Sequence, residues 1–206
     1  MNDHYYTRDP SSEHDIHTFE AEVCGNRLRF ETDSGVFSRN GLDEGTRILL
    51  EALPRLQGRI LDLCCGWGPI GIALLRANEG IDMVMTDVNT RAVDLAEKNL
   101  RINRCSAKVL QGEGLEKVEG TFDAIVTNPP IRAGKAVIYP LFEQCADRLR
   151  ENGALYLVIR KQQGAPSCVK FLKEIYGKVD IIEREKGYWV IRAGRTASSG
   201  DISDLS

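Results

Sequence analysis

The 206-residue sequence is poor in histidine: it has three, and all of them lie within the first 17 residues. A catalytic triad or a metal centre that depends on histidine is therefore not expected in the rest of the chain, and we predict no metal site. The six cysteines form no C-x-x-C pair, and the adjacent Cys64 and Cys65 cannot close an ordinary disulfide. Reduced thiols that pack as small hydrophobic groups in a cytoplasmic protein are the expected state.

Long hydrophobic runs are also missing. The longest stretch without a charged residue covers 13 residues, from Leu63 to Leu75, and glycines and a proline interrupt it. A membrane-spanning helix needs about 20 apolar residues, so no membrane partner is expected. The first 15 residues are polar and lack the apolar centre of a secretory signal. The formal net charge of −3 argues against binding of nucleic acid by bulk charge, although a local basic patch is still compatible with it.

The length corresponds to one globular domain. We expect residues 1–15 to form a flexible tail, residues 16–57 a β-hairpin and a helix, residues 58–195 the core of the same domain, and residues 196–206 a second flexible tail. Polar and apolar residues alternate on both sides of a Gly-Asn turn at positions 25 and 26, which predicts the hairpin. Apolar residues at helical spacing predict the helix over 43–56.

From residue 59 onward, predicted strands and helices alternate. Apolar runs predict strands at 60–63, 82–86, 107–110, 122–127 and 154–159, and helical spacing predicts helices at 69–77, 91–103, 137–149 and 168–175. The last two predicted strands, 179–182 and 188–191, are joined by a stretch too short for a parallel crossover. The pattern predicts an α/β fold: a doubly wound, mostly parallel seven-stranded sheet with an antiparallel last strand, plus the N-terminal β-hairpin.

A glycine-rich turn follows the strand at 60–63, and it contains the spacing Gly66-x-Gly68-x-x-Gly71. Glycine allows a ligand to approach the backbone, and the start of the next helix offers free N–H groups. The motif alone fits a structural turn, a dinucleotide site or a site for S-adenosylmethionine. Asp62 favours S-adenosylmethionine, because a carboxylate can accept hydrogen bonds from its ammonium group, whereas a pyrophosphate gains nothing from that charge.

Two other strand ends carry acidic side chains. Asp87 follows the strand at 82–86 and can accept hydrogen bonds from both hydroxyls of a ribose. Glu113 lies between Gly112 and Gly114 after the strand at 107–110, where an acid and the backbone can meet an adenine amine. A loop charge without a function is the alternative for Glu113.

The most specific pattern is Asn128-Pro129-Pro130-Ile131, which directly follows the strand at 122–127. The two prolines prevent the strand from continuing and stiffen the turn. The side-chain carbonyl of Asn128 and the backbone carbonyl of Pro129 can each accept an N–H from an exocyclic amine, which is a poor nucleophile. Such acceptors stabilise the charge that develops on the amine during transfer of a group to it, and no strong base is required.

Together these motifs resemble class I S-adenosylmethionine-dependent methyltransferases, and among them the small-domain, RsmC-like group of ribosomal RNA guanine-N2 methyltransferases. The resemblance covers residues 17–195. It includes Gly35-Val36-Phe37-Ser38 and Leu42-Asp43-x-Gly45-Thr46, which are similar to the segment that closes over the cofactor in this group. Ile131 differs from many amino-methyltransferases, which have an aromatic residue there to stack on the target base. Stacking is then expected from Phe37 or Trp67.

The resemblance implies S-adenosylmethionine as the cofactor. Residues implied in binding it are Phe37, Thr46, Asp62, Cys64, Gly66, Gly68, Asp87, Val88, Gly112, Glu113, Gly114 and Asn128. Those implied in catalysis are Asn128, Pro129, Pro130 and Ile131. Four basic residues on the same rim are expected to contact RNA phosphates, with ordinary surface charge as the alternative: Arg132, Lys135, Arg160 and Lys161.

The expected reaction is methylation of the N2 amine of a guanine in ribosomal RNA. A paired guanine cannot reach a pocket, so an exposed or flipped base is expected. The alternatives are a protein glutamine or DNA adenine amino-methyltransferase, an inactive cofactor-binding RNA scaffold and a nicotinamide oxidoreductase. Many larger relatives carry a second, degenerate domain that helps to hold RNA. We expect no room for one here, which makes a homodimer plausible.

Overall fold

The computed structural model describes residues 8–10 and 12–195. A sheet with the strand order β5-β4-β3-β6-β7-β9-β8 lies at its centre. The strands are β3 (Arg59–Leu63), β4 (Asp82–Asp87), β5 (Lys108–Gln111), β6 (Phe122–Thr127), β7 (Leu149–Arg160), β8 (Lys178–Glu185) and β9 (Tyr188–Gly194). Strands β3 to β7 pair in parallel, and β9 runs antiparallel to both of its neighbours. The predicted fold class is confirmed.

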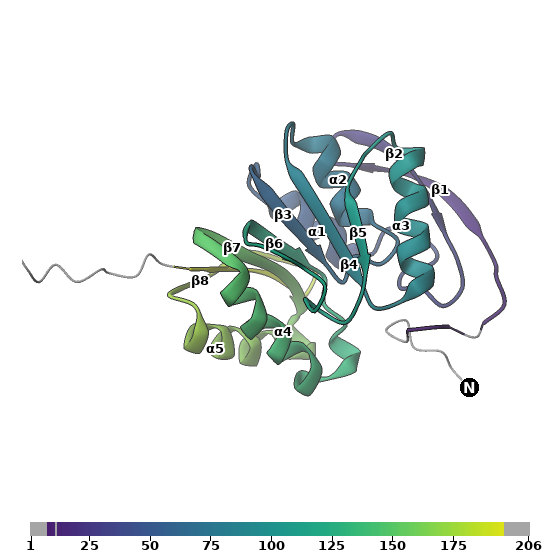
Figure 1. Ribbon diagram of the computed structural model, residues 1–206. Helices are drawn as coiled ribbons and strands as arrows, with labels where there is room; N and C mark the ends of the chain where they lie inside the picture. The colour runs from purple at the N-terminus through teal and green to yellow at the C-terminus, as the bar shows by residue number, and fades with distance from the viewer. Residues whose placement is uncertain (1–7, 11, 196–206) are drawn as a thin grey trace, which may run out of the picture.

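Helices cover both faces of this sheet (Figure 1). One face carries α1 (Glu44–Ala52), α2 (Pro69–Ala77) and α3 (Thr90–Ile102), and the other carries α4 (Lys135–Arg148) and α5 (Ala165–Ile175). Alternate residues of β7 enter the two cores: Tyr156 and Val158 pack under α1 to α3, and Leu155 and Leu157 pack under α4 and α5. A strand covered on both sides must be apolar throughout, which explains the unbroken apolar runs in the sequence.

The predicted hairpin is present as a separate two-stranded sheet, formed by β1 (His17–Val23) and β2 (Asn26–Thr32). Asn99 of α3 holds it in place. Its side-chain amide donates to the carbonyls of Glu31 at 2.8 Å and Trp67 at 2.9 Å, and its carbonyl oxygen accepts from the Glu31 N–H at 2.7 Å. One buried side chain thus fixes the hairpin relative to the glycine-rich turn after β3.

Helix α1 is shorter than the helix expected over 43–56. It ends at Ala52, and Leu53 has an extended backbone with φ −68° and ψ 137°. The cause is Pro54, because a residue that precedes proline is disfavoured in the helical region. At the other end, the carboxylate of Asp43 caps the helix by accepting from the Thr46 N–H at 3.0 Å.

The segment before the hairpin differs from the flexible tail expected over residues 1–15. In its described part, the Arg8 carbonyl accepts from the Thr90 N–H at 2.9 Å, and the Ser12 carbonyl accepts from Arg91 at 2.8 Å. Residues 1–7 and 196–206, also predicted to be flexible, lie outside the described residues, and the division into domains stays a prediction. Among the described residues, no helix combines the length and apolar character needed to cross a membrane.

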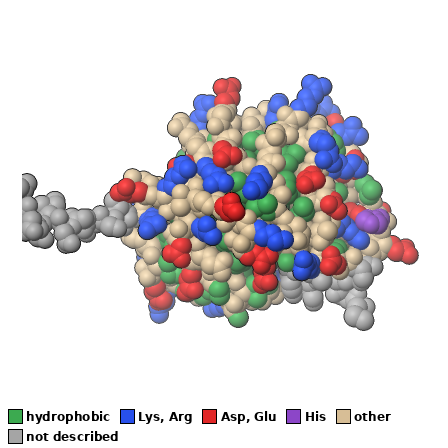
Figure 2. Space-filling view, in the orientation of Figure 1, with side chains coloured by type: hydrophobic (Ala, Val, Ile, Leu, Met, Phe, Trp, Pro, Cys, Tyr) green, Lys and Arg blue, Asp and Glu red, His purple; other side chains and the backbone are tan. Residues whose placement is uncertain are grey.

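The surface mixes both signs of charge. On the face drawn in Figure 2, Lys and Arg side chains alternate with Asp and Glu, and hydrophobic side chains lie between them in small groups. This distribution agrees with the small net charge of the sequence. No continuous basic surface covers this face.

Candidate active site

A pocket of about 1110 Å³ opens at the carboxyl ends of β3, β4 and β6. Strands β3 and β6 are neighbours in the sheet, but β4 and β5 separate them in the chain. Ligands of doubly wound sheets bind at such a switch point. The walls of the pocket come from the turns after β3 to β6, from residues 37–46 and from helix α4.

The glycine-rich turn after β3 presents its backbone to this pocket. Gly66 has a φ of +55°, and a Cβ atom at this position would meet nothing within 4 Å. The open space beside Gly66 is therefore room that a ligand can use. Gly68 serves the packing of the helix instead. A Cβ there would lie 3.1 Å from both Ile72 and Met85, so this glycine allows α2 to pack closely and does not line the pocket.

Asp87 links the turns after β3 and β4. Its carboxylate accepts from the N–H of Gly66 at 2.8 Å and from the N–H of Asn89 at 2.9 Å. Burial raises the pKa of Asp87, although hydrogen bonds from the backbone of Asn89, Gly66 and Val88 oppose the shift. A carboxylate has about four acceptor directions, so Asp87 can still accept from one hydroxyl of a ligand in the pocket that it lines.

Asp62 lies behind the pocket wall and does not line the pocket. Its side chain is fully buried, one oxygen accepts from the Gly71 N–H at 2.8 Å, and the other oxygen has no partner among the described residues. Burial raises the pKa of Asp62 to about 7; the Gly71 N–H opposes this shift and the charge of Asp87 adds to it. A buried carboxylate with an unused acceptor fits a cationic ligand group, but its predicted contact with an ammonium needs a bridging water or a shift of the turn.

The pKa of Asp62 leads to a prediction about pH. Affinity for S-adenosylmethionine should rise between about pH 6 and pH 8, because Asp62 loses its proton in this window and only the carboxylate stabilises an ammonium. Asp62→Asn should bind more weakly and show a smaller rise. Burial keeps the pKa of Cys64 and Cys65 well above the window, so neither thiol contributes.

Calorimetric titration of both proteins at several pH values checks this prediction. The α-amino group of the cofactor also titrates near pH 8, but it does so equally with both proteins. An identical pH profile for the wild type and Asp62→Asn would remove Asp62 from the site.

The Asn128 side chain is anchored from one side by α1 and its cap. Its amide nitrogen donates to the carboxylate of Asp43 at 3.0 Å and to the hydroxyl of Thr46 at 2.9 Å. Both N–H groups are therefore used, and the side-chain carbonyl is the group left to accept a hydrogen bond in the pocket, which Asn128 lines. In the sequence, Asp43 belongs to the segment similar to the one that closes over the cofactor, without a link to Asn128. Only the tertiary structure brings it to Asn128, 85 positions away.

Only part of the turn predicted to be catalytic, residues 128–131, lines the pocket. Pro129 and Pro130 line the pocket, and the Pro129 carbonyl already accepts from the Ile131 N–H at 2.8 Å. One lone pair of that carbonyl is still available to a substrate. The side chain of Ile131 packs instead against the core under α4 and α5, so it does not line the pocket as expected for a catalytic residue.

Of the two aromatic residues proposed to stack on a base, Phe37 is the more exposed. Trp67 is 1% exposed, donates its indole N–H to the Phe37 carbonyl at 2.9 Å and packs edge-on against Phe30 with 4.9 Å between ring centres. Trp67 borders the pocket, but its ring is buried in the core, which argues against stacking on a base. Phe37 is 37% exposed and lines the pocket.

Helix α4 forms a wall that the sequence pattern did not predict. Its lining residues are Ala136, Val137, Pro140, Leu141, Gln144, Asp147 and Arg148. Pro140 lies inside the helix and lacks the N–H that would otherwise bond to the Ala136 carbonyl. A proline within a predicted helix is the one signal in the sequence that marks this wall as unusual.

Most of the predicted cofactor residues surround the pocket. Those that line it are Phe37, Thr46, Cys64, Gly66, Asp87, Val88, Gly112, Glu113, Gly114 and Asn128. The predicted RNA-contacting residues lie outside it, after β6 and at the end of β7: Arg132, Lys135, Arg160 and Lys161. None of these four forms an ion pair with another described residue, and Arg160 lies over the ring of Tyr188 at 4.6 Å from its centre.

Comparison with known proteins identifies the family. The model of the methyltransferase small domain matches residues 27–192. The uncharacterized protein YbxB of Bacillus subtilis is 39% identical over 198 residues, which cover 94% of this chain and 98% of that protein. Ribosomal RNA small subunit methyltransferase C of Shewanella denitrificans is 46% identical over 151 residues, which cover 71% of this chain and 43% of that protein.

A solved structure supports the same family assignment. The 16S rRNA N2 G1207 methyltransferase RsmC of T. thermophilus, in complex with AdoMet and guanosine, superposes with a TM-score of 0.80 at 28% identity, over 90% of this chain and 52% of that one. The chain thus spans about half the length of the ribosomal RNA methyltransferases that it matches. The family match favours methyl transfer over the nicotinamide and inactive-scaffold alternatives. The chain belongs to the methyltransferase small domain family and is an RsmC-like class I S-adenosylmethionine-dependent methyltransferase.

Proposed function

We propose that the protein methylates the exocyclic N2 amine of a guanine in ribosomal RNA. The observation that carries this proposal is the anchored amide of Asn128, whose nitrogen is held by Asp43 and Thr46 and whose carbonyl is left for an amine donor. The RsmC structure, which holds AdoMet and guanosine, supports the same substrate class.

The residues around the pocket have different proposed roles in binding and catalysis. Asp87 and the open backbone at Gly66 would hold the ribose and the amino-acid part of the cofactor, and residues 112–114 would hold its adenine; all of these residues line the pocket. When bound, the cofactor supplies a methyl group on a sulfonium. The Asn128 carbonyl and the second lone pair of Pro129 then orient the amine and stabilise the positive charge that it gains as the N–C bond forms and the S–C bond breaks. The proton released from the amine goes to solvent.

Holding the methyl group and the amine in line supplies a further part of the rate enhancement. The four basic residues after β6 and at the end of β7 would bind phosphates of the RNA around an exposed or flipped guanine. The protein would work in the cytoplasm, as a monomer or as a homodimer. Light scattering can distinguish these two oligomeric states.

The test uses labelled S-adenosylmethionine with ribosomal subunits and total RNA from a strain that lacks the protein. The expected result is one labelled guanine that carries the methyl on N2, with no labelling by Asn128→Ala. Label in protein glutamine or DNA adenine instead would support the alternative amino-methyltransferase activity, which shares the Asn-Pro-Pro turn. Label on a ribose hydroxyl or on a ring nitrogen would contradict both.

Phe37 allows a prediction about the target base. Phe37→Ala should lower kcat/KM for RNA about tenfold or more, because stacking of a base on an aromatic ring is worth about 1–3 kcal/mol. Phe37→Tyr should keep most of the activity. Steady-state kinetics with saturating cofactor measure the effect, and equilibrium titration of the cofactor separates it from weaker cofactor binding. Equal RNA kinetics for Phe37→Ala and the wild type would show that another group holds the base.

A further inference from the structure

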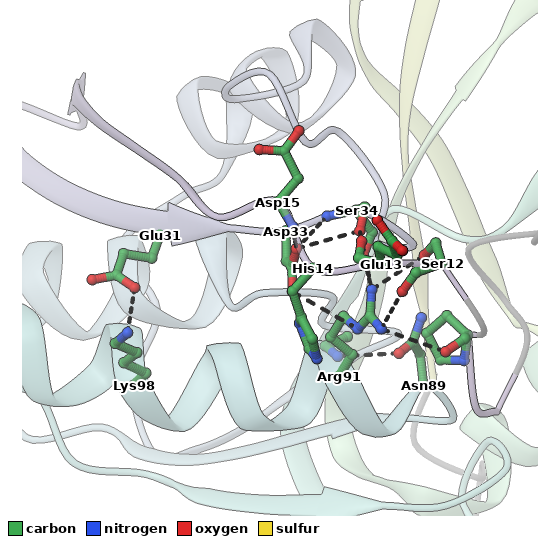
Figure 3. A network of polar contacts seen from close by, with 12 residues as sticks. Ser12, Glu13, His14, Asp15, Glu31, Asp33, Ser34, Asn89, Arg91 and Lys98 are labelled. Carbon is green, nitrogen blue, oxygen red and sulfur yellow. Dashed lines mark hydrogen bonds and ion pairs between the residues drawn. The ribbon is translucent and has the colours of Figure 1, made fainter.

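Arg91 lies in the first turn of α3 and joins three parts of the chain that are far apart in sequence (Figure 3). One guanidinium nitrogen donates to the Ser34 carbonyl at 2.8 Å, and the other donates to the Ser12 carbonyl at 2.8 Å. Its Nε atom lies 3.8 Å from the Asp33 carboxylate. The Arg91 side chain is only 12% exposed, so these contacts are formed away from bulk solvent.

Asp33, which directly follows β2, is the second charged residue of this network. It is 3% exposed, and its carboxylate accepts from the backbone N–H of Asp15 at 2.6 Å, from the N–H of Ser34 at 2.7 Å and from the His14 ring. Burial alone would raise the pKa of Asp33, but these hydrogen bonds and the charge of Arg91 outweigh it and the pKa is lowered. Asp33 is therefore a buried carboxylate held by residues 14 and 15 and by Arg91.

The loop that follows Asp33 carries one wall of the pocket. The Gly35 carbonyl accepts from the Asn89 side chain at 2.9 Å, and the Phe37 carbonyl accepts from Trp67 at 2.9 Å. A Cβ atom at Gly35 would lie 2.7 Å from Pro10, so the N-terminal segment packs directly on this loop. The backbone of Asn89 also bonds to the predicted ribose-binding carboxylate. The loop, the N-terminal segment and that carboxylate thus form one connected network.

We propose that Arg91 is a positioning residue for cofactor binding: with Asp33 it fastens residues 12–15 across residues 33–38 and so holds the Phe37 wall in the conformation that binds the cofactor. The proposal rests on the proposed function only in taking this pocket as the S-adenosylmethionine site. A wall that is ordered before the ligand arrives does not need to be ordered by binding, so affinity increases. Arg91 itself does not line the pocket.

The test compares Arg91→Ala with Lys98→Ala. Lys98 is a matched control on the same helix: it also forms an ion pair, with Glu31 of β2, but that pair lies away from residues 33–38 (Figure 3). Arg91→Ala should raise the Kd for S-adenosylmethionine about tenfold, with kcat at saturating cofactor reduced less than about threefold. Lys98→Ala should stay within about twofold of the wild type in both.

A second measurement reports on the loop itself. Arg39 lies in the same loop and pairs with Asp15, so trypsin cleavage after Arg39 measures how firmly residues 12–15 cover it. Without cofactor, cleavage at this bond should be at least about fivefold faster in Arg91→Ala than in Lys98→Ala, and cofactor should slow it in both. Mass spectrometry identifies the fragment that ends at Arg39.

Two outcomes would overturn the proposal: an unchanged Kd in Arg91→Ala, or a weaker Kd with wild-type cleavage at Arg39. If Arg91→Ala does not fold, Asp33→Asn replaces it, because this substitution keeps the size of the side chain and removes its charge. Asp33→Asn should also raise the Kd and speed cleavage at Arg39, each by a smaller factor. Absence of these two effects would overturn the proposal as well. Failure of the proposed function is distinguishable: a protein that methylates another substrate would still show both effects of Arg91→Ala, and if the pocket were not the cofactor site, the difference in cleavage without cofactor would persist while the Kd would not change.

Discussion

Asn128→Ala is expected to reduce methyl transfer more than about 100-fold while the affinity for S-adenosylmethionine changes less than about threefold. The variant loses the carbonyl that we propose accepts from the amine, and removal of one such preorganised group costs enzymes about 10²–10³ in rate. We propose that the turns after β3, β4 and β5 hold most of the cofactor, and this substitution leaves those turns intact. Single-turnover transfer and calorimetric titration measure the two quantities separately.

The neighbouring residue provides a matched control. Thr127 is fully buried, and its hydroxyl has no hydrogen-bond partner among the described residues. Thr127→Val keeps the shape of that side chain and should keep the activity. Asp43→Ala should give a smaller loss than Asn128→Ala, because Thr46 still holds the amide. Transfer by Asn128→Ala within about threefold of the wild type would exclude Asn128 from catalysis.

The second large effect concerns the cofactor. Asp87→Ala is expected to weaken binding of S-adenosylmethionine about 10- to 100-fold, since a hydrogen bond to a charged group contributes about 1.5–3 kcal/mol and Asp87 is proposed to accept one from the ribose. The substitution also removes the acceptor that the Gly66 and Asn89 N–H groups use, so both turns lose their link.

Asp82→Ala is the control for this experiment. Asp82 is at the opposite end of β4, where its exposed carboxylate pairs with Arg59 at 3.2 Å, so its removal should leave cofactor binding unchanged. Calorimetry on both variants and thermal melting with and without cofactor provide the measurements. Asp87→Ala binding within about threefold of the wild type would place the ribose elsewhere.

The sequence predicted the strands of this fold closely because they are buried on both sides. The predicted boundaries of β6 (Phe122–Thr127) and α2 (Pro69–Ala77) are those of the structure. Boundaries were less accurate where a local effect competes with the apolar pattern. Pro54 shortens α1 at Ala52. Strand β7 begins at Leu149, before its predicted start, because Leu149 already pairs with Phe122 of β6; a register irregularity separates this pair from the regular pairing that starts at Ala154.

By itself, the sequence determined the class of fold, the place of the pocket and the residue types at the strand ends, because strand periodicity, glycine and proline act within a few neighbouring residues. Only the tertiary structure decided which of these groups are available. It buried Trp67, turned the Ile131 side chain into the core, placed Asp62 behind the wall and joined Asn128 to Asp43. Exposure and hydrogen-bond partners depend on residues that are distant in the chain, and no local pattern encodes their distance in space.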